Sequence, residues 1–292
     1  MHATTTFPKQ IGEFRVIGIL GHGATGIVYQ AHDPTTRSQV AIKTIPLTLH
    51  DQEAGKLLAL RLRREALAAG RLSHANVTRI LSFGEDQGIP FLVMELHQGV
   101  PLREIIRTPR RPGREQGVAI MLQTLAGLEH VHGHGVIHCD LKPANIILLP
   151  NDQVKITDFG AARFANEPAP ATSKVTGTHG YMAPEQLMGQ KIDARADLFS
   201  AGVILHELLT GNKPFQGAAT QEITQNILTQ PPSDPASFDA SIPAPFFAVV
   251  KKALAKRPRD RFPNAALFME ALALAHQNRL APFLTNDNDN PA

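Results

Sequence analysis

The chain has 292 residues, 43% of them hydrophobic, so it can bury one large core or two packed lobes. Its formal charge of +3 is spread over interspersed acidic and basic residues, without the strongly basic runs typical of nucleic-acid binding. The single cysteine, Cys139, excludes an internal disulfide. No apolar stretch reaches the roughly 20 residues needed to span a bilayer. We expect a soluble, cytoplasmic protein that does not bind nucleic acid.

The first third of the sequence has the pattern of a small β-sheet. The β-branched runs are FRVIGIL, IVYQA, QVAIKTI, VTRILSF and IPFLVMEL, separated by turn-forming segments. One helix is expected between the third and fourth runs, over about residues 51–72. Within it Leu58, Leu62 and Glu65 are spaced by four and three residues, so they share one face.

The remainder is mostly helical in pattern. Two long apolar helices, VAIMLQTLAGLEHVHGHG and ADLFSAGVILHELLTG, end in glycine, and NIILL and QVKIT form a short strand pair between them. Further helices are ITQNILTQ, AVVKKALAK and NAALFMEALALAH. The predicted fold is α+β, with a small antiparallel sheet lobe and a larger helical lobe. The predicted boundaries are a disordered N-terminus (1–12), an N-lobe (13–96), a C-lobe (101–275) and a tail (276–292).

A glycine-rich segment, GHGATG at residues 21–26, lies between the first two strands. Glycine allows backbone N–H groups to approach nucleotide phosphates without a Cβ clash. Alone the segment fits an ordinary turn equally well. A dinucleotide-binding fold is disfavoured, because a strand and not a helix follows.

Lys43 ends the apolar run Val40-Ala41-Ile42, where an ammonium group is costly without anionic partners. A lysine facing solvent from an edge strand is the alternative. Glu65, on the apolar face of the predicted helix, is the expected partner that directs Lys43 toward the α- and β-phosphates of a nucleotide. Glu53 competes for this role, but it has no apolar neighbours at the same helical phase.

The octet HCDLKPAN at residues 138–145 follows a helix and precedes a strand, which is typical of a catalytic loop. Asp140 can accept the proton of an attacking hydroxyl, and Lys142 can neutralise charge on a transferring phosphoryl group. Asn145 can offer an amide oxygen to a divalent metal. Asp158, in the tripeptide DFG, is the expected second ligand, since Mg²⁺ prefers oxygen.

These motifs occur in a fixed order: the glycine loop, Lys43, Glu65, HCDLKPAN, Asp158, Ala183-Pro184-Glu185, Asp197 and Arg261. In this order they resemble the Hanks-type serine/threonine protein kinases, particularly the bacterial members, over about residues 14–275. The resemblance implies a bilobal kinase domain, here 13–275, that uses ATP with Mg²⁺ or Mn²⁺. It also implies phosphoryl transfer to Ser or Thr hydroxyls of protein substrates, with autophosphorylation as a further expected activity.

The resemblance also implies roles for individual residues. Nucleotide binding is assigned to Leu20, Gly21, Gly23, Gly26, Val28, Ala41, Lys43, Met94 (the gatekeeper), Glu95, His97 and Ile147. Structural roles are assigned to His138, Phe159, Glu185, Asp197 and Arg261. Of these, Asp197 is expected to brace the catalytic loop, and Glu185 to pair with Arg261. Specificity for Ser and Thr follows from Lys142 and from Thr178, which is expected to bridge Asp140 and Lys142.

Cys139 departs from the family pattern, because an Arg usually precedes the catalytic Asp and pairs with a phosphorylated activation loop. The candidate phosphosites are Thr172, Ser173 and Thr176. With this switch in doubt, control by a regulatory protein or by a kinase-domain dimer is expected. The chain is either cytoplasmic as a whole or the cytoplasmic catalytic domain of a longer, membrane-anchored protein.

Two other functions fit part of the pattern. A pseudokinase scaffold would bind partners without chemistry, although every expected catalytic group is present. A small-molecule phosphotransferase would lack the long segment from Asp158 to Ala183.

The closely spaced histidines near residue 132 do not have the spacing of helical metal ligands. The basic residues after the interlobe linker predict a solvated loop or, as the alternative, a docking site for acidic substrates: Arg107, Arg110, Arg111 and Arg114.

Overall fold

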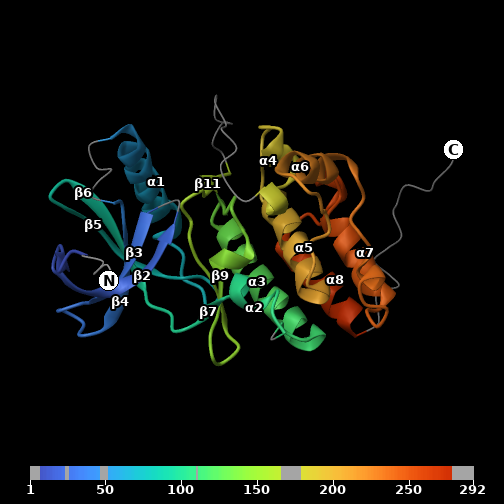
Figure 1. Cartoon of the computed structure of the whole chain (residues 1–292), viewed down its shortest axis with the longest axis horizontal. Helices are drawn as coiled ribbons and strands as arrows, with labels where there is room; N and C mark the ends of the chain where they lie inside the picture. The colour runs from blue at the N-terminus through green and yellow to red at the C-terminus, as the bar shows by residue number, and fades with distance from the viewer. Residues whose placement is uncertain (1–6, 24–25, 47–51, 110, 166–178, 278–292) are drawn as a thin grey trace. The chain divides into compact units, whose positions relative to one another are not determined.

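The structure is a computed structural model of the chain, and it describes residues 7–23, 26–46, 52–109, 111–165 and 179–277. The chain divides into two compact units, whose elements are labelled in Figure 1. The sheet unit comprises Met1–Gln98 and Thr157–Ala162, and the helical unit comprises Gly99–Ile156 and Arg163–Ala292. The tripeptide DFG therefore belongs to the sheet unit, although it follows much of the helical unit in the sequence.

The sheet unit contains one antiparallel sheet of six strands, in the spatial order β1-β2-β3-β4-β6-β5. The strands are β1 (Gln10–Ile11), β2 (Phe14–Gly23), β3 (Gly26–His32), β4 (Gln39–Thr44), β5 (Ile80–Asp86) and β6 (Ile89–Glu95). The five β-branched runs form β2 to β6, because such side chains suit a pleated, half-buried surface, whereas no run predicted the short strand β1. Only β5 begins later in the sequence than its run, VTRILSF, predicts.

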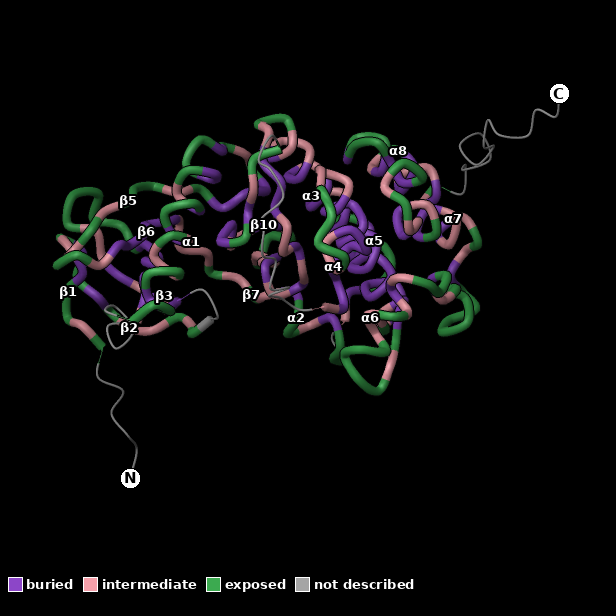
Figure 2. Tube along the Cα trace, turned by 90° about the horizontal axis from the view of Figure 1, so that it is seen from above, coloured by how far each residue is buried: buried purple, intermediate pink, exposed green. Residues whose placement is uncertain are grey.

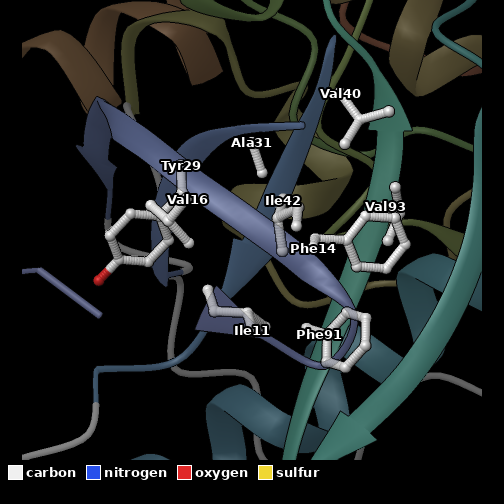
Figure 3. Close-up of a cluster of buried hydrophobic side chains, with 9 residues drawn as sticks. All are labelled: Ile11, Phe14, Val16, Tyr29, Ala31, Val40, Ile42, Phe91 and Val93. Atoms are coloured by element: carbon white, nitrogen blue, oxygen red, sulfur yellow. The ribbon is translucent and has the colours of Figure 1, made fainter. Parts of the chain in front are cut away.

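One face of the sheet carries a buried hydrophobic cluster, drawn in Figure 3. Its members are Ile11, Phe14, Val16, Tyr29, Ala31, Val40, Ile42, Phe91 and Val93. The rings of Phe14 and Phe91 meet edge to face with centroids 6.0 Å apart, a favourable geometry. Because neighbouring residues on a strand point to opposite faces, Val40 and Ile42 join this cluster while Ala41 faces the other way.

The other face of the sheet packs against α1 (Glu53–Ala69), which contacts β5 and β6. Leu62 of α1 forms a second buried cluster with Ala41, Leu92 and other residues of the sheet. Glu65 lies three residues after Leu62 and is buried as well. The helical spacing seen in the sequence therefore directs a carboxylate toward the sheet.

The helical unit contains two small sheets, with strand orders β10-β9-β7 and β11-β8, and seven α-helices in the described ranges. Its strands are β7 (Val100–Pro101), β8 (Val136–Ile137), β9 (Ile146–Leu148), β10 (Val154–Ile156) and β11 (Arg163–Phe164). Its helices are α2 (Leu102–Ile105), α3 (Arg114–Gly133), α4 (Pro184–Leu187), α5 (Arg195–Thr210), α6 (Thr220–Thr229), α7 (Ala244–Ala253) and α8 (Ala265–His276). Short 3₁₀ turns cover Pro143–Asn145, His179–Tyr181, Pro235–Ser237 and Pro258–Asp260.

Helix α5 forms the centre of the helical unit. Every residue after Arg195 in this helix is buried, as the purple tube in Figure 2 shows, and α3 and α7 pack against it. A helix that is apolar on all sides is expected to lie in a core. It ends at Gly211, whose φ of 74° lies in the left-handed region that glycine adopts without strain.

The two units confirm the predicted α+β fold class, with a small antiparallel sheet and one main helix in one part and mostly helices in the other. The predicted domain boundaries remain a prediction. Among the helices of the described ranges, none combines the length and the hydropathy that a membrane span requires.

Candidate active site

Lys43 on β4 is the centre of a buried ionic cluster in the sheet unit. Its Nζ lies 2.7 Å from Oε2 of Glu65 and 2.6 Å from Oδ1 of Asp158. Burial by itself would lower the pKa of Lys43, but the two carboxylates raise it above its ordinary value. The lysine is therefore charged at neutral pH. Glu53, the competing partner, is exposed and lies 3.6 Å from Lys56 instead.

Glu65 also contacts the DFG segment. Its second oxygen, Oε1, accepts a hydrogen bond from the backbone N–H of Phe159 at 3.1 Å. Burial raises the pKa of Glu65, against the opposing effect of Lys43. Asp158 has a φ of 63°, a region that costs free energy for residues other than glycine and that is often found at functional sites.

The residues predicted to contact adenine within the sheet unit lie on neighbouring strands. Ala41 pairs with Met94 across β4 and β6, and both belong to the cluster that Val28 packs against. Leu20 is 47% exposed on β2. The predicted Ile147 lies on β9 of the helical unit and is half-buried.

The hinge residues and the glycine loop complete the predicted nucleotide set. Glu95 ends β6, and Nε2 of His97 lies 3.1 Å from Oγ1 of Thr78. Gly21 pairs with Val28, and Gly23 pairs with Gly26 across β2 and β3. A Cβ on Gly26 would lie 2.3 Å from the carbonyl oxygen of Thr44, so only glycine fits there.

The catalytic loop brings three predicted residues together in the helical unit. Nζ of Lys142 lies 2.5 Å from Oδ2 of Asp140. Nδ2 of Asn145, in the 3₁₀ turn, donates to the carbonyl oxygen of Asp140 at 2.9 Å. This bond uses the amide nitrogen of Asn145, so the amide oxygen is not part of the contact with Asp140. The Asp140 and Lys142 side chains are about one fifth exposed and accessible to a substrate.

Asp197 of α5 binds the backbone of this loop and fixes its position. Its two oxygens accept the backbone N–H groups of His138 and Cys139 at 2.8 Å each, and Oδ2 also lies 2.8 Å from Nε2 of His132. Burial alone would raise the pKa of Asp197, but these partners lower it below its ordinary value. Cys139 has a φ of 65°, so the Asp197 contacts secure a strained turn next to Asp140.

Glu185 and Arg261 form a buried bidentate pair, with N–O distances of 2.6 and 2.7 Å. The guanidinium also donates to the carbonyl oxygens of Arg195 and Lys256. These contacts fix the segment Ala183-Pro184-Glu185 to the start of α5. Arginine suits this position because its planar fork matches a carboxylate while its remaining donors are satisfied.

Two interactions were missed in the sequence. Gln186 accepts the N–H of Ala183 through Oε1 at 3.0 Å and donates through Nε2 to the carbonyl oxygen of Cys139 at 2.8 Å. No local pattern signals this long-range bridge. Glu207, fully buried in α5, accepts from the Tyr181 hydroxyl at 2.5 Å and from Arg107 at 2.8 Å. A single acid in the apolar C-terminal half of this helix was a signal that could have found it.

Four predicted residues lie outside the described residues: Thr172, Ser173, Thr176 and Thr178. His132 binds Asp197, while Nδ1 of His134 bonds the carbonyl oxygen of His130. Within the described ranges, no group of three or more potential ligands could hold a metal ion.

Comparison with known proteins identifies the family. The protein kinase domain family matches residues 14–273. The chain is 37% identical to the probable serine/threonine-protein kinase SCO3848 of Streptomyces coelicolor, over 88% of this chain and 39% of that protein. It is 36% identical to the serine/threonine-protein kinase Pkn1 of Myxococcus xanthus, over 90% of this chain and 38% of that protein.

A third relative is the serine/threonine-protein kinase PknB of Mycolicibacterium smegmatis, with 34% identity over 94% of this chain and 45% of that protein. The chain thus spans less than half the length of these curated relatives. The match covers both units and every motif from the glycine loop to Arg261. The chain belongs to the protein kinase family, among the bacterial serine/threonine kinase domains.

Proposed function

We propose that this chain transfers the γ-phosphoryl group of ATP to Ser and Thr hydroxyls of protein substrates in bacterial signalling. The observation that carries the proposal is the catalytic loop, where the side chains of Lys142 and Asn145 both lie within hydrogen-bond distance of Asp140. Family membership supports the same reaction. A pseudokinase scaffold that catalyses no reaction would not need three polar side chains that converge on a loop supported by the buried Asp197.

In the proposed reaction, Asp140 orients the substrate hydroxyl and accepts its proton. The hydroxyl oxygen then forms a bond to the γ-phosphorus, while the bond between that phosphorus and the bridging oxygen of ADP breaks. Lys142, which lies 2.5 Å from Asp140, stabilises negative charge on the transferring group. The carboxylate of Asp140 stays in place because Asp197 and Asn145 hold its loop.

Lys43 is proposed to bind the α- and β-phosphates, and Glu65 to keep its ammonium directed at them. Asp158 and Asn145 are proposed as metal ligands, and their carboxylate and amide oxygens are the hard donors that Mg²⁺ prefers. When bound, the metal ion neutralises phosphate charge. We propose Mg²⁺ as the physiological ion, with Mn²⁺ as an effective substitute.

The remaining site assignments are also proposals. Adenine would be bound by Leu20, Val28, Ala41, Met94 and Ile147 with the backbone of Glu95 and His97, and the phosphates by Gly21, Gly23 and Gly26. Thr178 would bridge Asp140 and Lys142. Autophosphorylation would fall on Thr172, Ser173 or Thr176. We also propose a domain over 13–275, a cytoplasmic site of action, and control by a regulatory protein or a second copy of the domain.

Radiolabelled ATP with a Ser- and Thr-containing protein substrate tests the reaction. The wild-type chain should turn over at about 1–100 s⁻¹ with Mg²⁺, the usual range for kinases. Asp140→Asn should lose most turnover and still bind ATP, because Asp140 acts on the hydroxyl and not on the nucleotide. Lys43→Met should be inactive. Phosphotyrosine as the main product, or an active Asp140→Asn variant, would contradict the proposal.

A further inference from the structure

A cavity of about 580 Å³ lies in the helical unit, and no catalytic residue lines it. Its walls come from the connection between α2 and α3, the turn after α5, and the start of α6. Three cationic side chains line it: Arg107, Arg111 and Lys213. The described lining includes no Asp or Glu. Exposed Thr108, Asn212 and Gln216 at its edge show that solvent reaches it.

Within the described residues, Arg107 is the one of these three cations whose side chain forms an ion pair with a carboxylate. Its Nε and Nη2 each lie 2.8 Å from Oε1 of the buried Glu207. Another nearby acid is Glu222, beside Gly217, and its carboxylate accepts the N–H of Ala218 at 2.7 Å. A third acid, Asp239, lies outside the lining, and its pKa is lowered by hydrogen bonds from Ser241 and also by the nearby Arg111.

Arg111 and Lys213 have different surroundings. Nη1 of Arg111 donates to the carbonyl oxygen of Leu209 at 3.0 Å, near the end of α5. Nζ of Lys213 lies 4.1 Å from the ring centroid of Tyr181, and within the described residues no carboxylate pairs with it. Burial lowers the pKa of Lys213, with Arg107 acting in the same direction against Glu207. An anion placed here would restore the favourable environment of a charged ammonium.

The cavity adjoins the segment that leads to the catalytic loop. The Lys213 ammonium lies against Gly180, where a Cβ would come within 2.7 Å of Nζ. Three residues later Ala183 begins the Ala-Pro-Glu segment, and Gln186 ties that segment to Cys139, the neighbour of Asp140. A peptide whose hydroxyl reaches Asp140 has the wall of this cavity within reach of its flanking residues.

We propose that this cavity binds the carboxylate of an Asp or Glu in the protein substrate, through Lys213 and Arg111. The proposal rests on the proposed kinase function and adds a substrate preference to it. A carboxylate suits this place because the Lys213 ammonium has no ion pair with a carboxylate among the described residues, and Arg111 donates only to a neutral carbonyl oxygen there.

The test compares peptides that carry one phosphorylatable Thr and either Glu or Gln at each flanking position in turn. We expect kcat/KM of the wild-type chain to favour Glu over Gln about tenfold at one position, as a charge-assisted hydrogen bond in a half-exposed site would give. Lys213→Gln and Arg111→Gln should each reduce this ratio to about twofold. The matched control is Lys251→Gln, an exposed lysine on α7, which should keep the wild-type ratio.

A Glu preference that is absent in the wild-type chain, or unchanged in both cavity variants, overturns the proposal. If the chain prefers peptides with phosphoserine at a flanking position and does not prefer Glu over Gln there, the assignment of a carboxylate ligand to this cavity is wrong. If no peptide is phosphorylated at all, the proposed kinase function fails separately. In that case fluorescence anisotropy still tests the cavity. A labelled peptide with Glu at all flanking positions should bind roughly tenfold more tightly than its Gln counterpart, and Lys213→Gln should abolish the difference.

Discussion

The carboxylate of Glu65 accepts the backbone N–H of Phe159 at 3.1 Å through the oxygen that Lys43 does not use. One buried side chain thus contacts both Lys43, the proposed phosphate-binding lysine, and the backbone of the DFG segment. Rotation of α1 would break both contacts together. A partner that moves α1 would therefore change the proposed phosphate site and the proposed metal ligand Asp158 in a single step.

Glu65→Gln removes the negative charge of this side chain and keeps its size, so it tests whether the charge is needed. The amide is nearly isosteric, but its NH₂ group must face either Lys43 or the N–H of Phe159, both of which are donors. We expect kcat/KM to fall about 10- to 100-fold, the loss of one hydrogen bond to a charged group. Steady-state kinetics with varied ATP measures this. Glu53→Gln, exposed on the same helix, should stay within twofold, and an equally active Glu65→Gln would contradict the coupling.

Asp197 makes stability depend on pH in the acid range. Its pKa is lowered from the ordinary value of 3.8, since its hydrogen bonds outweigh the effect of burial. A carboxyl group with a depressed pKa stabilises the folded state above its unfolded-state value, and the stabilisation is lost as the pH falls through the folded-state value. We therefore expect this contribution to be fully present above about pH 4 and to disappear below it.

Asp197→Asn should remove that contribution and lower the free energy of unfolding by about 3–5 kcal/mol, because one partner of a buried charged network is lost. Urea unfolding at pH 7 and at pH 3 measures both effects. The difference between wild type and variant should shrink at the lower pH. A difference that is the same at both pH values would show that the Asp197 charge does not stabilise the fold.

The sequence predicted the parts of this site whose signals are local. Glu65 was predicted from helical spacing, Asp140 and Asn145 from one short loop, and α5 from its very apolar composition. Gln186 could not be predicted in this way, since its partner Cys139 is distant in the sequence and a polar residue there has no periodicity. The geometry of such bridges depends on how the chain folds back on itself, which spacing does not encode.

The Glu185–Arg261 pair should be far more important for stability than an exposed pair. Arg261→Lys should lower the free energy of unfolding by about 2–4 kcal/mol, because lysine cannot make the bidentate contact and the carbonyl oxygens of Arg195, Ala255 and Lys256 lose their donor. Arg257, paired with Asp260 at 2.7 Å in the same region, is 67% exposed and is the matched control. Arg257→Lys should cost less than about 1 kcal/mol, the range for surface pairs. Equal costs in chemical unfolding would show that burial of the first pair adds nothing.

We expect Cys139 to make activity less dependent on phosphorylation of the segment that contains Thr172, Ser173 and Thr176. Where kinases of this family carry Arg before the catalytic Asp, a phosphate on this segment gains a direct cationic partner. Here burial, together with Asp197, raises the pKa of the Cys139 thiol, so this position is neutral at pH 7. Arg163 is the nearby cation that remains, on β11 opposite Ile137 of β8.

Changing all three candidate phosphosites to Ala should therefore leave activity on an added substrate within a few-fold of wild type. Cys139→Arg supplies the missing cation, and in that background the same triple change should reduce activity at least tenfold, since a charge-assisted contact of about 1.5–3 kcal/mol is then at stake. Phosphate incorporation and kcat/KM are measured on all four proteins. A triple variant of the natural chain that folds and binds ATP but is inactive would show that phosphorylation of this segment is the switch after all, with Arg163 as the cation that receives it.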